Sequence, residues 1–363
     1  MAIFINSIMR NSNFELLRIV CMLFIVLGHI NGKHKGVMDL SSVNYWVDFA
    51  IMPFVCVAVN SFVLISGYWG IKFKMERLLK LNLQTWFYSV LIFGVTFILG
   101  WHSFSLTKDL GVFIPVFSKQ YWFITVYVAL YLLSPILNLF STSLSKNNFK
   151  VVLGIGFLLF YVWPTGSFLI NTGQLVDDAG YGIVNFSYLY LLGRYMRLYY
   201  IDKQEKKYYL LGYFCCCTLC FLGQLSLSWV LGFEFTSWYS YNTIFILGGS
   251  VCLFLYFSRL NVQSPLINGL AKSCLAVYLI HMGPELWTRL CHEFNLIEYS
   301  GGEYVFLLIL SPVLIYLLCA IIDHIRIFLF KALEDYVVTG ICKIKILMRV
   351  QTLMDHLNFK NNE

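Results

Sequence analysis

The chain has 363 residues, of which 59% are hydrophobic and 12% are charged, and its mean hydropathy is +0.72. Soluble globular domains carry about 25% charged residues. The composition therefore excludes an ordinary soluble domain and indicates an all-α, polytopic integral membrane protein. The net charge of +7 is compatible with a nucleic-acid partner, but in a membrane protein the placement of the basic residues matters more. We therefore predict membrane lipids, and no nucleic acid, as partners.

Apolar runs long enough to cross a hydrocarbon core of about 30 Å recur along the whole chain. We predict about ten transmembrane helices, of which the fifth is the shortest. In chain order the predicted spans are Leu16–Ile30, Tyr45–Trp69, Leu81–Trp101, Tyr121–Phe140, Val151–Trp163, Ile183–Tyr199, Tyr208–Leu231, Tyr241–Phe257, Leu266–Trp287 and Tyr304–Ile327.

The basic residues outside these spans orient the helices, because cytoplasmic loops of membrane proteins carry an excess of Lys and Arg. The amino terminus, the connections after even-numbered spans and the carboxyl tail hold 21 of the 26 basic residues. Both termini are therefore predicted to be cytoplasmic. The 21 residues are Arg10, Arg18, Lys72, Lys74, Arg77, Lys80, Lys146, Lys150, Arg194, Arg197, Lys203, Lys206, Lys207, Arg259, Lys272, Arg326, Lys331, Lys343, Lys345, Arg349 and Lys360. The five predicted to lie outside are Lys33, Lys35, Lys108, Lys119 and Arg289.

Two parts of the chain differ in character. We predict that residues 1–330 form one ten-helix transmembrane domain and that residues 331–363 form a cytoplasmic tail. In the tail, apolar residues recur with basic residues among them, a pattern typical of an amphipathic helix at a membrane interface. These apolar residues are Val337, Ile341, Ile344, Leu347 and Met354.

The eleven cysteines do not indicate a metal centre. Ten lie in or beside apolar runs, where cysteine behaves as a small hydrophobic residue. Cys217 and Cys220 form a CxxC pair, but no second ligand pair follows at the spacing of a zinc site. We predict neither a structural metal nor a disulfide framework.

The first predicted span carries ionisable residues at both ends. On an α-helix the eleven residues from Arg18 to His29 rise about 16 Å and complete about three turns, so the two side chains share a face. Arg18 can serve as a snorkelling anchor and Glu15 can pair with it at i, i+3. An ionisable group deep in a span, such as His29, usually faces a cavity or a partner. The pair favours a functional site over an anchor alone.

Further polar residues lie in other spans. His281, nine residues beyond Lys272, is predicted to lie near the depth of His29, because both spans run outward. It can share a cavity with His29 or simply bond a backbone carbonyl. The remaining polar side chains are better explained as hydrogen-bonding links between helices. These are Asn60, Ser61, Ser66 and Asn138.

Four motifs resemble those of the membrane acyltransferase 3 family. Arg18 and His29, with ten residues between them, are similar to the Arg-x10-His signature of its first span. FVLISGYWG (Phe62–Gly70) resembles the Ser-Gly-Tyr end of the second span, and YWFITVYVALYLLSPILN (Tyr121–Asn138) resembles the Trp-initiated fourth. AVYLIH (Ala276–His281) resembles a Tyr-Leu-Ile-His segment. The resemblance covers nearly the whole chain and keeps the order of the motifs.

The resemblance implies a ten-span enzyme of the bacterial cytoplasmic membrane that acylates cell-surface sugars. The donor implied is acyl-CoA, most simply acetyl-CoA, which is a substrate and not a bound cofactor. The acceptor implied is a hydroxyl of a cell-surface or lipid-linked glycan. The catalytic residues implied are His29 and His281. The substrate-binding residues implied are Glu15, Arg18, Ser66, Tyr68, Arg77, Lys80 and Trp122.

Two positions depart from the family pattern. The loop after the second span often reads Arg-x-x-Arg in the family, whereas here Lys80 follows Arg77, which replaces a bidentate fork by a point charge. Many members place a glutamate shortly after the fourth-span tryptophan, but this chain has Tyr127 there. We therefore assign no acid at that place.

The chemistry implied is acyl transfer. Acyl-CoA phosphates would meet Arg18, Arg77 and Lys80, and the pantetheine arm would reach about 16 Å to His29. There His29 would act as general base on the acceptor hydroxyl, or as a nucleophile that forms an acyl-imidazole. A secondary transporter or a glycan flippase is the alternative, although we find no inverted repeats with broken spans. The acceptor, the acyl chain length and the oligomeric state stay open.

Overall fold

The computed structural model describes residues 12–34, 38, 41–102, 105, 109–170, 172–200, 204–283, 286–293 and 295–359, and these form helices, turns and loops without a strand. The long helices are α1 (Ser12–His34), α2 (Val43–Trp69), α3 (Met75–Ile98), α5 (Trp122–Ser143), α8 (Ile183–Tyr199), α9 (Lys206–Leu231), α10 (Ile244–Ser258), α14 (Gly301–Cys342) and α15 (Lys345–Phe359). The shorter ones are η1 (Leu110–Phe113), α6 (Lys146–Phe157), η2 (Leu158–Val162), α7 (Trp163–Ile170), η3 (Ser237–Tyr239), α11 (Pro265–Ala271), α12 (Cys274–His281), α13 (Leu286–Glu293) and η4 (Leu296–Glu298). The predicted all-α class is confirmed.

Eight helical segments of the described residues are long and apolar enough to cross a membrane. They are Ser12–His34, Val43–Trp69, Met75–Ile98, Trp122–Ser143, Lys146–Ile170, Lys206–Leu231, Ser237–Ser258 and Gly301–Cys342. The predicted sixth span is α8, whose 17 residues extend about 25 Å, less than the hydrocarbon thickness. The total of about ten spans and the cytoplasmic placement of the termini stay predictions, and Arg10, Lys35, Lys108, Lys203 and Lys360 lie outside the described residues.

The predicted ninth span is not one continuous helix. It begins as α11 and α12, and the segment Pro265–His281 meets the segment Leu286–Glu298 at 81°. His281 is the last residue of α12. Side chains at such a helix break can face a cavity, because irregular backbone at membrane depth occurs only where protein or water satisfies its polar groups.

The predicted fifth span is longer than expected and contains a local change of pitch. Its helix runs from Lys146 to Ile170, and five residues, Leu158–Val162, adopt π-helical hydrogen bonding directly before Trp163 and Pro164. Proline has no N–H to donate to the carbonyl four residues earlier. A π-turn beside it lets the helix continue past that missing bond.

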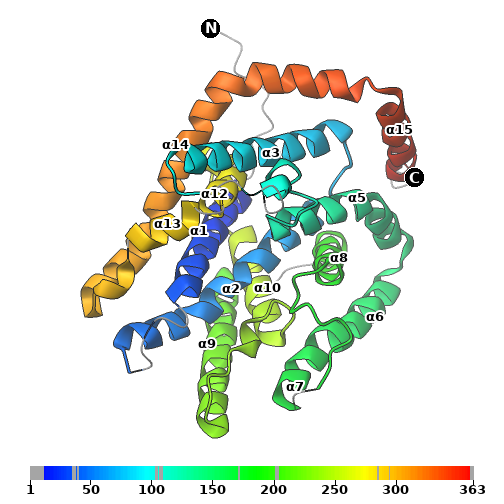
Figure 1. Cartoon of the computed structure of the whole chain (residues 1–363). Helices are drawn as coiled ribbons and strands as arrows, with labels where there is room; N and C mark the ends of the chain where they lie inside the picture. Colours follow the sequence, from blue (N-terminus) through cyan, green and yellow to red (C-terminus); the bar gives the residue numbers. More distant parts are fainter. Residues whose placement is uncertain are drawn as a thin grey trace.

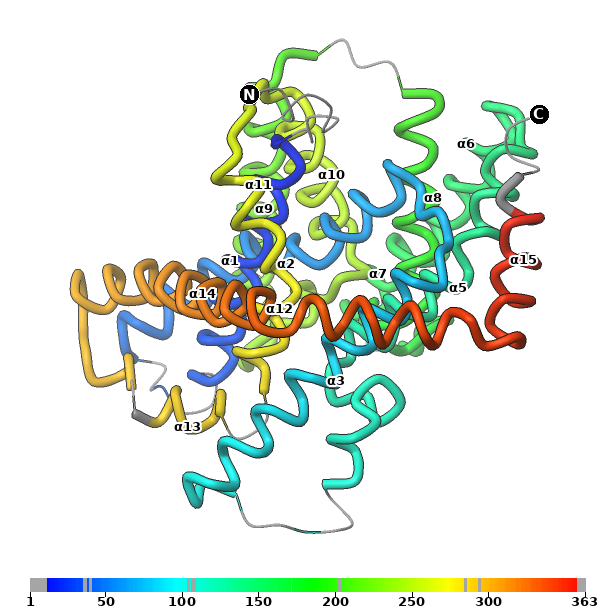
Figure 2. The backbone as a smooth tube through the Cα atoms, turned by 90° about the horizontal axis from the view of Figure 1, so that it is seen from above, coloured from blue at the N-terminus to red at the C-terminus, as the bar shows by residue number. Residues whose placement is uncertain are grey.

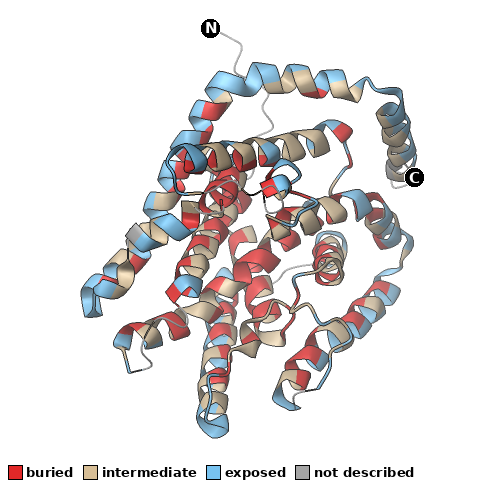
Figure 3. Ribbon diagram, viewed as in Figure 1, coloured by how far each residue is buried: buried red, intermediate tan, exposed pale blue. Residues whose placement is uncertain are grey.

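Helix α2 lies at the centre of the bundle, where α1, α8 and α10 pack around it (Figure 1). Glycines bring α2 and α8 into backbone contact. A Cβ at Gly67 would lie 2.2 Å from the backbone oxygen of Tyr190, and one at Gly193 would lie 2.6 Å from that of Leu64. Small residues permit this close approach in membrane bundles. Figure 3 shows that buried residues concentrate on these central helices, whereas α14 is largely exposed and α15 consists of exposed and intermediate residues.

The carboxyl-terminal part crosses the molecule. The 42 residues of α14 extend about 63 Å, twice the hydrocarbon thickness, and Figure 2 shows α14 crossing to α15 on the far side. No break in α14 marks residue 330, where we place the end of the transmembrane domain. The following helix, α15, packs Leu347, Val350 and Met354 against Phe73 and Tyr131. Of the five apolar residues of the predicted amphipathic pattern, Leu347 and Met354 therefore pack on this cluster, whereas Val337 and Ile341 belong to α14. Contact of this part with a membrane stays a prediction.

Candidate active site

One cavity of about 960 Å³ lies inside the bundle between α1, α2, α5 and α12. On α1, it is lined at regular helical spacing by Arg18, Met22, Ile25, His29 and Gly32. The shared face of Arg18 and His29 that the spacing predicts is therefore the face of α1 that borders the cavity. The cavity continues along nearly the full length of this helix.

The two ends of the cavity differ in their lining. Arg18, Leu81 and Lys272 line one end, which the distribution of basic residues predicts to face the cytoplasm. Lys33 and Thr288 line the other end. His29 therefore lies between two positively charged ends, about 16 Å along α1 from Arg18 and about 6 Å from Lys33.

His29 and His281 form a direct hydrogen bond. Nδ1 of His29 lies 2.9 Å from Nε2 of His281, and Nδ1 of His281 bonds the backbone oxygen of Val277 one turn earlier on α12. A carbonyl oxygen only accepts, so Nδ1 of His281 carries the proton and its Nε2 accepts from Nδ1–H of His29. These assignments leave Nε2 of His29 unprotonated.

The exposure of the two rings differs. His281 is 1% exposed and does not line the cavity, whereas His29 does. Nε2 of His29 has no hydrogen-bond partner among the described residues. The geometry therefore presents one basic nitrogen to the cavity and uses the second histidine to hold its tautomer and orientation.

Arg18 forms a salt bridge with the buried carboxylate of Glu15. Its Nη1 bonds both carboxylate oxygens of Glu15, at 3.1 and 3.2 Å. Glu15 is 6% exposed, whereas the Arg18 side chain is 33% exposed. The predicted i, i+3 pair therefore exists, and it leaves Nε and Nη2 of Arg18 without a protein partner in the described part of the chain. Those groups can donate to an anion.

The amino-terminal end of α1 is fixed to the loop before α11. The backbone N–H of Val262 donates to Oδ1 of Asn13 at 2.7 Å, and that of Ser264 donates to Oγ of Ser12 at 3.0 Å. Side-chain oxygens thereby satisfy loop amides that the helices leave free. These bonds keep Arg18 and Lys272 at the same end of the cavity.

Ser66 and Trp122 also line this cavity, as does Tyr127. Oγ of Ser66 lies 3.3 Å from the hydroxyl of Tyr127, so the residue at the place where the resemblance implies glutamate in many members contributes a hydroxyl group. The Trp122 ring contacts Tyr181 at a centroid distance of 4.6 Å and stacks on Tyr241 at 6.1 Å. These rings form one wall of the cavity.

Four predicted binding residues, Glu15, Tyr68, Arg77 and Lys80, do not line the cavity. Tyr68 accepts a hydrogen bond from Arg197 at 3.4 Å and packs on Phe14. Lys80 bonds Glu76 and Asp335, each at 2.8 Å.

Arg77 is exposed and stands one helical turn before Leu81, which does line the cavity. Arg77 therefore lies on the helix face that leads to the end of the cavity lined by Arg18, whereas carboxylates bind Lys80.

The predicted links are present for Asn60, Ser66 and Asn138, whereas Oγ of Ser61 donates to the backbone oxygen of Val57 in its own helix. Nδ2 of Asn60 donates to the backbone oxygen of Tyr241 at 2.8 Å, and Nδ2 of Asn138 donates to that of Ile71 at 2.8 Å. Oδ1 of Asn138 also accepts from the hydroxyl of Tyr190 at 2.8 Å. These side chains join helices and loops, as expected for buried polar groups in a membrane bundle.

Sequence reasoning missed several residues of the cavity wall. Lys33 stands four residues after His29, so helical spacing was a signal that would have placed it on the same face. Tyr181 and Tyr241 gave no such signal, because they lie in loops far apart in the chain. Only the folding of those loops brings them beside Trp122.

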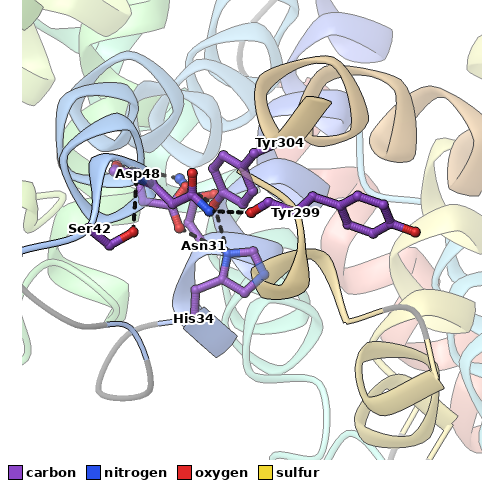
Figure 4. Close-up of polar contacts among 7 residues, drawn as sticks. Asn31, His34, Ser42, Asp48, Tyr299 and Tyr304 are labelled. Carbon is purple, nitrogen blue, oxygen red and sulfur yellow. Dashed lines mark hydrogen bonds and ion pairs between the residues drawn. The ribbon is translucent and has the colours of Figure 1, made fainter. Parts of the chain in front are cut away.

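A second polar cluster lies apart from the cavity, at the junction of α1, α2 and α14 (Figure 4). Nδ1 of His34 donates to Oδ2 of Asp48 at 2.9 Å, and the hydroxyl of Tyr304 donates to Oδ1 at 2.6 Å. His34 and Asp48 are less than one-tenth exposed, and Tyr304 is fully buried. Nearby, Nδ2 of Asn44 donates to the backbone oxygen of Tyr299 at 2.7 Å. These hydrogen bonds connect the end of α1 with the first turns of α2 and α14.

Comparison with known families matches most of the chain to one family model. Residues 11–322 match a family model described as an acyltransferase domain, Acyl_transf_3. The match includes every predicted site residue. Neither the curated proteins nor the solved structures give a match.

Proposed function

Because the chain belongs to the acyltransferase 3 family, as its motifs predict, we propose that it transfers an acyl group from acyl-CoA to a glycan hydroxyl. The acyl group is most simply acetyl, and the acceptor is a cell-surface or lipid-linked sugar. The observation that carries this proposal is one cavity with Arg18 at one end and His29 inside it. We place the protein in the bacterial cytoplasmic membrane.

The cytoplasmic end of the cavity suits the donor. Arg18 keeps guanidinium N–H groups beyond its pair with Glu15, and Lys272 lines the same end. Both cations can bind the phosphates of acyl-CoA. The thin pantetheine arm would then extend along α1, where about 16 Å separates Arg18 from His29.

The chemistry follows from the free nitrogen of His29. In the proposed reaction, Nε2 of His29 takes the proton of the acceptor hydroxyl as its oxygen attacks the thioester carbonyl. The C–S bond then breaks, and the proton on His29 passes to the departing thiolate. The products are an O-acylated sugar and free CoA. The hydrogen bond to His281 keeps Nε2 directed at the hydroxyl throughout.

A covalent route uses the same atom. Nε2 of His29 can attack the thioester itself and form an acyl-imidazole, which the sugar hydroxyl then opens. The tautomer fixed by His281 serves both routes, because each needs a lone pair on Nε2. Mass analysis of peptides from acid-quenched protein, after mixing with labelled acetyl-CoA alone, distinguishes them: label on the His29 peptide indicates the covalent route.

The function is tested with purified, detergent-solubilised protein and labelled acetyl-CoA. We expect CoA release that depends on an added glycan, and label on that glycan. A transporter or flippase would do neither. The matched variant is His29→Gln, which preserves side-chain size and polarity but has no basic nitrogen. Absence of glycan-dependent CoA release from the unmodified protein, with every acceptor offered, contradicts the proposal.

A further inference from the structure

A positive charge stands one turn beyond His29, at the end of the cavity opposite to Arg18. We infer that the acceptor sugar carries an anionic group, a carboxylate or a phosphate, close to the hydroxyl that is acylated, and that Lys33 binds it. This inference rests on the proposed function. It extends that function by naming the charge of the acceptor.

Lys33 is positioned for such contact. It lines the cavity, as does Thr288 of α13. Its Nζ donates to Oγ1 of Thr288 at 3.3 Å, and no carboxylate of the described residues pairs with it. An ammonium group has three donors, so at least two remain for a ligand. Thr288 adds a hydroxyl beside them.

A positive charge such as that of Lys33 is unusual on the predicted outer side of the membrane. The predicted outer side carries only five of the 26 basic residues, and outer loops of membrane proteins are usually poor in Lys and Arg. Of the three in the described part of the chain, Lys119 and Arg289 do not line the cavity, whereas Lys33 does. The cavity lining therefore distinguishes Lys33 from the other two predicted outer basic residues that the structure describes.

The wall formed by three aromatic rings suits a sugar. Trp122, Tyr181 and Tyr241 line the cavity together, and the rings of Tyr181 and Tyr241 lie 4.8 Å apart. Aromatic rings with a polar hydroxyl present an apolar face and a hydrogen-bonding edge. A pyranose has the complementary pattern, with C–H groups on its faces and hydroxyls around its rim.

This aromatic wall is fixed by buried backbone contacts. The backbone N–H of Tyr241 donates to the oxygen of Ala179 at 3.0 Å, and Asn60 holds the oxygen of Tyr241. Gly180 adopts φ +81°, and a Cβ there would lie 2.7 Å from the backbone nitrogen of Asn242. The two loops are thus joined without a ligand, which lowers the entropic cost of binding one.

Helix geometry limits the distance between charge and hydroxyl. Lys33 follows His29 by four residues, a rise of about 6 Å and a rotation of about 40°. An anion bound by Lys33 therefore lies about one sugar ring from a hydroxyl at Nε2 of His29. Arg18 is about 16 Å away in the other direction, so the two cations serve different substrates.

Calorimetric titration of the purified protein in detergent tests the inference. The probes are p-nitrophenyl β-D-glucuronide and p-nitrophenyl β-D-glucoside, which differ only at C6, and glucose 6-phosphate with glucose as the matched pair for phosphate. We expect at least one anionic probe to bind about tenfold to a hundredfold more tightly than its neutral partner. The pair that shows the preference distinguishes a carboxylate from a phosphate.

The variants assign the preference to one side chain. Lys33→Gln removes the charge and is expected to reduce the preference to less than twofold, whereas Lys33→Arg retains it. Lys119→Gln is the control, since it removes a predicted outer lysine that does not line the cavity. Equal affinity of the unmodified protein for anionic and neutral probes, no binding of either anionic probe, or a preference that survives in Lys33→Gln overturns the inference.

Acetyl transfer is measured separately on the same proteins. If glycan-dependent CoA release occurs without regard to acceptor charge, the inference fails and the proposed function stands. If no acceptor elicits CoA release, the proposed function fails, whatever the binding experiment shows.

Discussion

Nδ1 of His29 lies 2.9 Å from Nε2 of His281, although the two residues are 252 positions apart in the chain. Because Nδ1 of His281 is committed to the carbonyl oxygen of Val277, this single hydrogen bond determines which nitrogen of His29 is free. His281 is the last residue of α12, and the packing of α12 against α1 places it beside the ring of His29, which lines the cavity.

Replacing His29 should abolish most acyl transfer without preventing donor binding. A general base contributes about 10²–10⁴-fold in rate, so His29→Gln and His29→Ala should reduce transfer from labelled acetyl-CoA by that factor. Acetyl-CoA affinity, measured by equilibrium binding, should stay unchanged. Transfer at the unmodified rate would remove His29 from the mechanism.

His281 should act on orientation, and its loss should be partial. His281→Leu removes the acceptor for Nδ1–H of His29 and should lower kcat by about tenfold, the worth of one hydrogen bond at the site, with KM for acetyl-CoA unchanged. His281→Gln can still accept that proton through its amide oxygen, so it should recover part of the loss. Equal kcat values for the two variants would contradict a positioning role.

Arg18 should bind the donor. Arg18→Ala removes guanidinium donors at the cytoplasmic end of the cavity and should weaken acetyl-CoA binding by about 1.5–3 kcal/mol, the worth of a charge-assisted hydrogen bond. Arg77→Ala should be milder, since Lys72 and Lys74 lie in the same loop. Lys80→Ala should change binding least, because Glu76 and Asp335 already occupy its ammonium group. Normal affinity for acetyl-CoA in a well-folded Arg18→Ala protein would refute the role of Arg18 in binding the donor.

The Asp48 cluster should contribute to stability and not to catalysis. Asp48→Ala leaves His34 and Tyr304 without their shared acceptor and should destabilise the protein by about 1–3 kcal/mol for each of the two buried donors that it leaves unsatisfied. Tyr304→Phe removes one donor only and should cost about 1–3 kcal/mol. Thermal unfolding in detergent, monitored by intrinsic fluorescence, ranks the stabilities of the two variants. A larger loss in Tyr304→Phe than in Asp48→Ala would be inconsistent with this network.

The predicted topology can be checked by cysteine labelling. In a cysteine-free background, Lys119→Cys should react in intact cells with a maleimide that cannot cross the membrane, because its loop is predicted to face outward. Lys74→Cys should react only after the membrane is permeabilised. Both side chains are exposed, so a difference reports the side of the membrane. Labelling of Lys74→Cys in intact cells would reverse the orientation.

The sequence by itself determined those features that depend on the properties of neighbouring residues in the chain. Apolar run length and hydrogen-bond requirements in lipid make helices the outcome, and predicted spans such as Tyr45–Trp69 and Tyr208–Leu231 correspond closely to α2 and α9. Helical periodicity places Arg18 and His29 on one face, and both line one cavity. The order of four motifs indicated the family, which the match over residues 11–322 confirms.

Contacts between distant segments were decided only by the tertiary structure. Three contacts join segments that helical periodicity in the sequence cannot relate to one another. They are the pairing of His29 with His281, the aromatic wall of Trp122 with Tyr181 and Tyr241, and the salt bridge of Lys80 with Asp335. The 81° break after α12 also went unpredicted. Hydropathy reports whether a segment tolerates lipid, but the direction of a side chain inside the bundle depends on which helices pack against it.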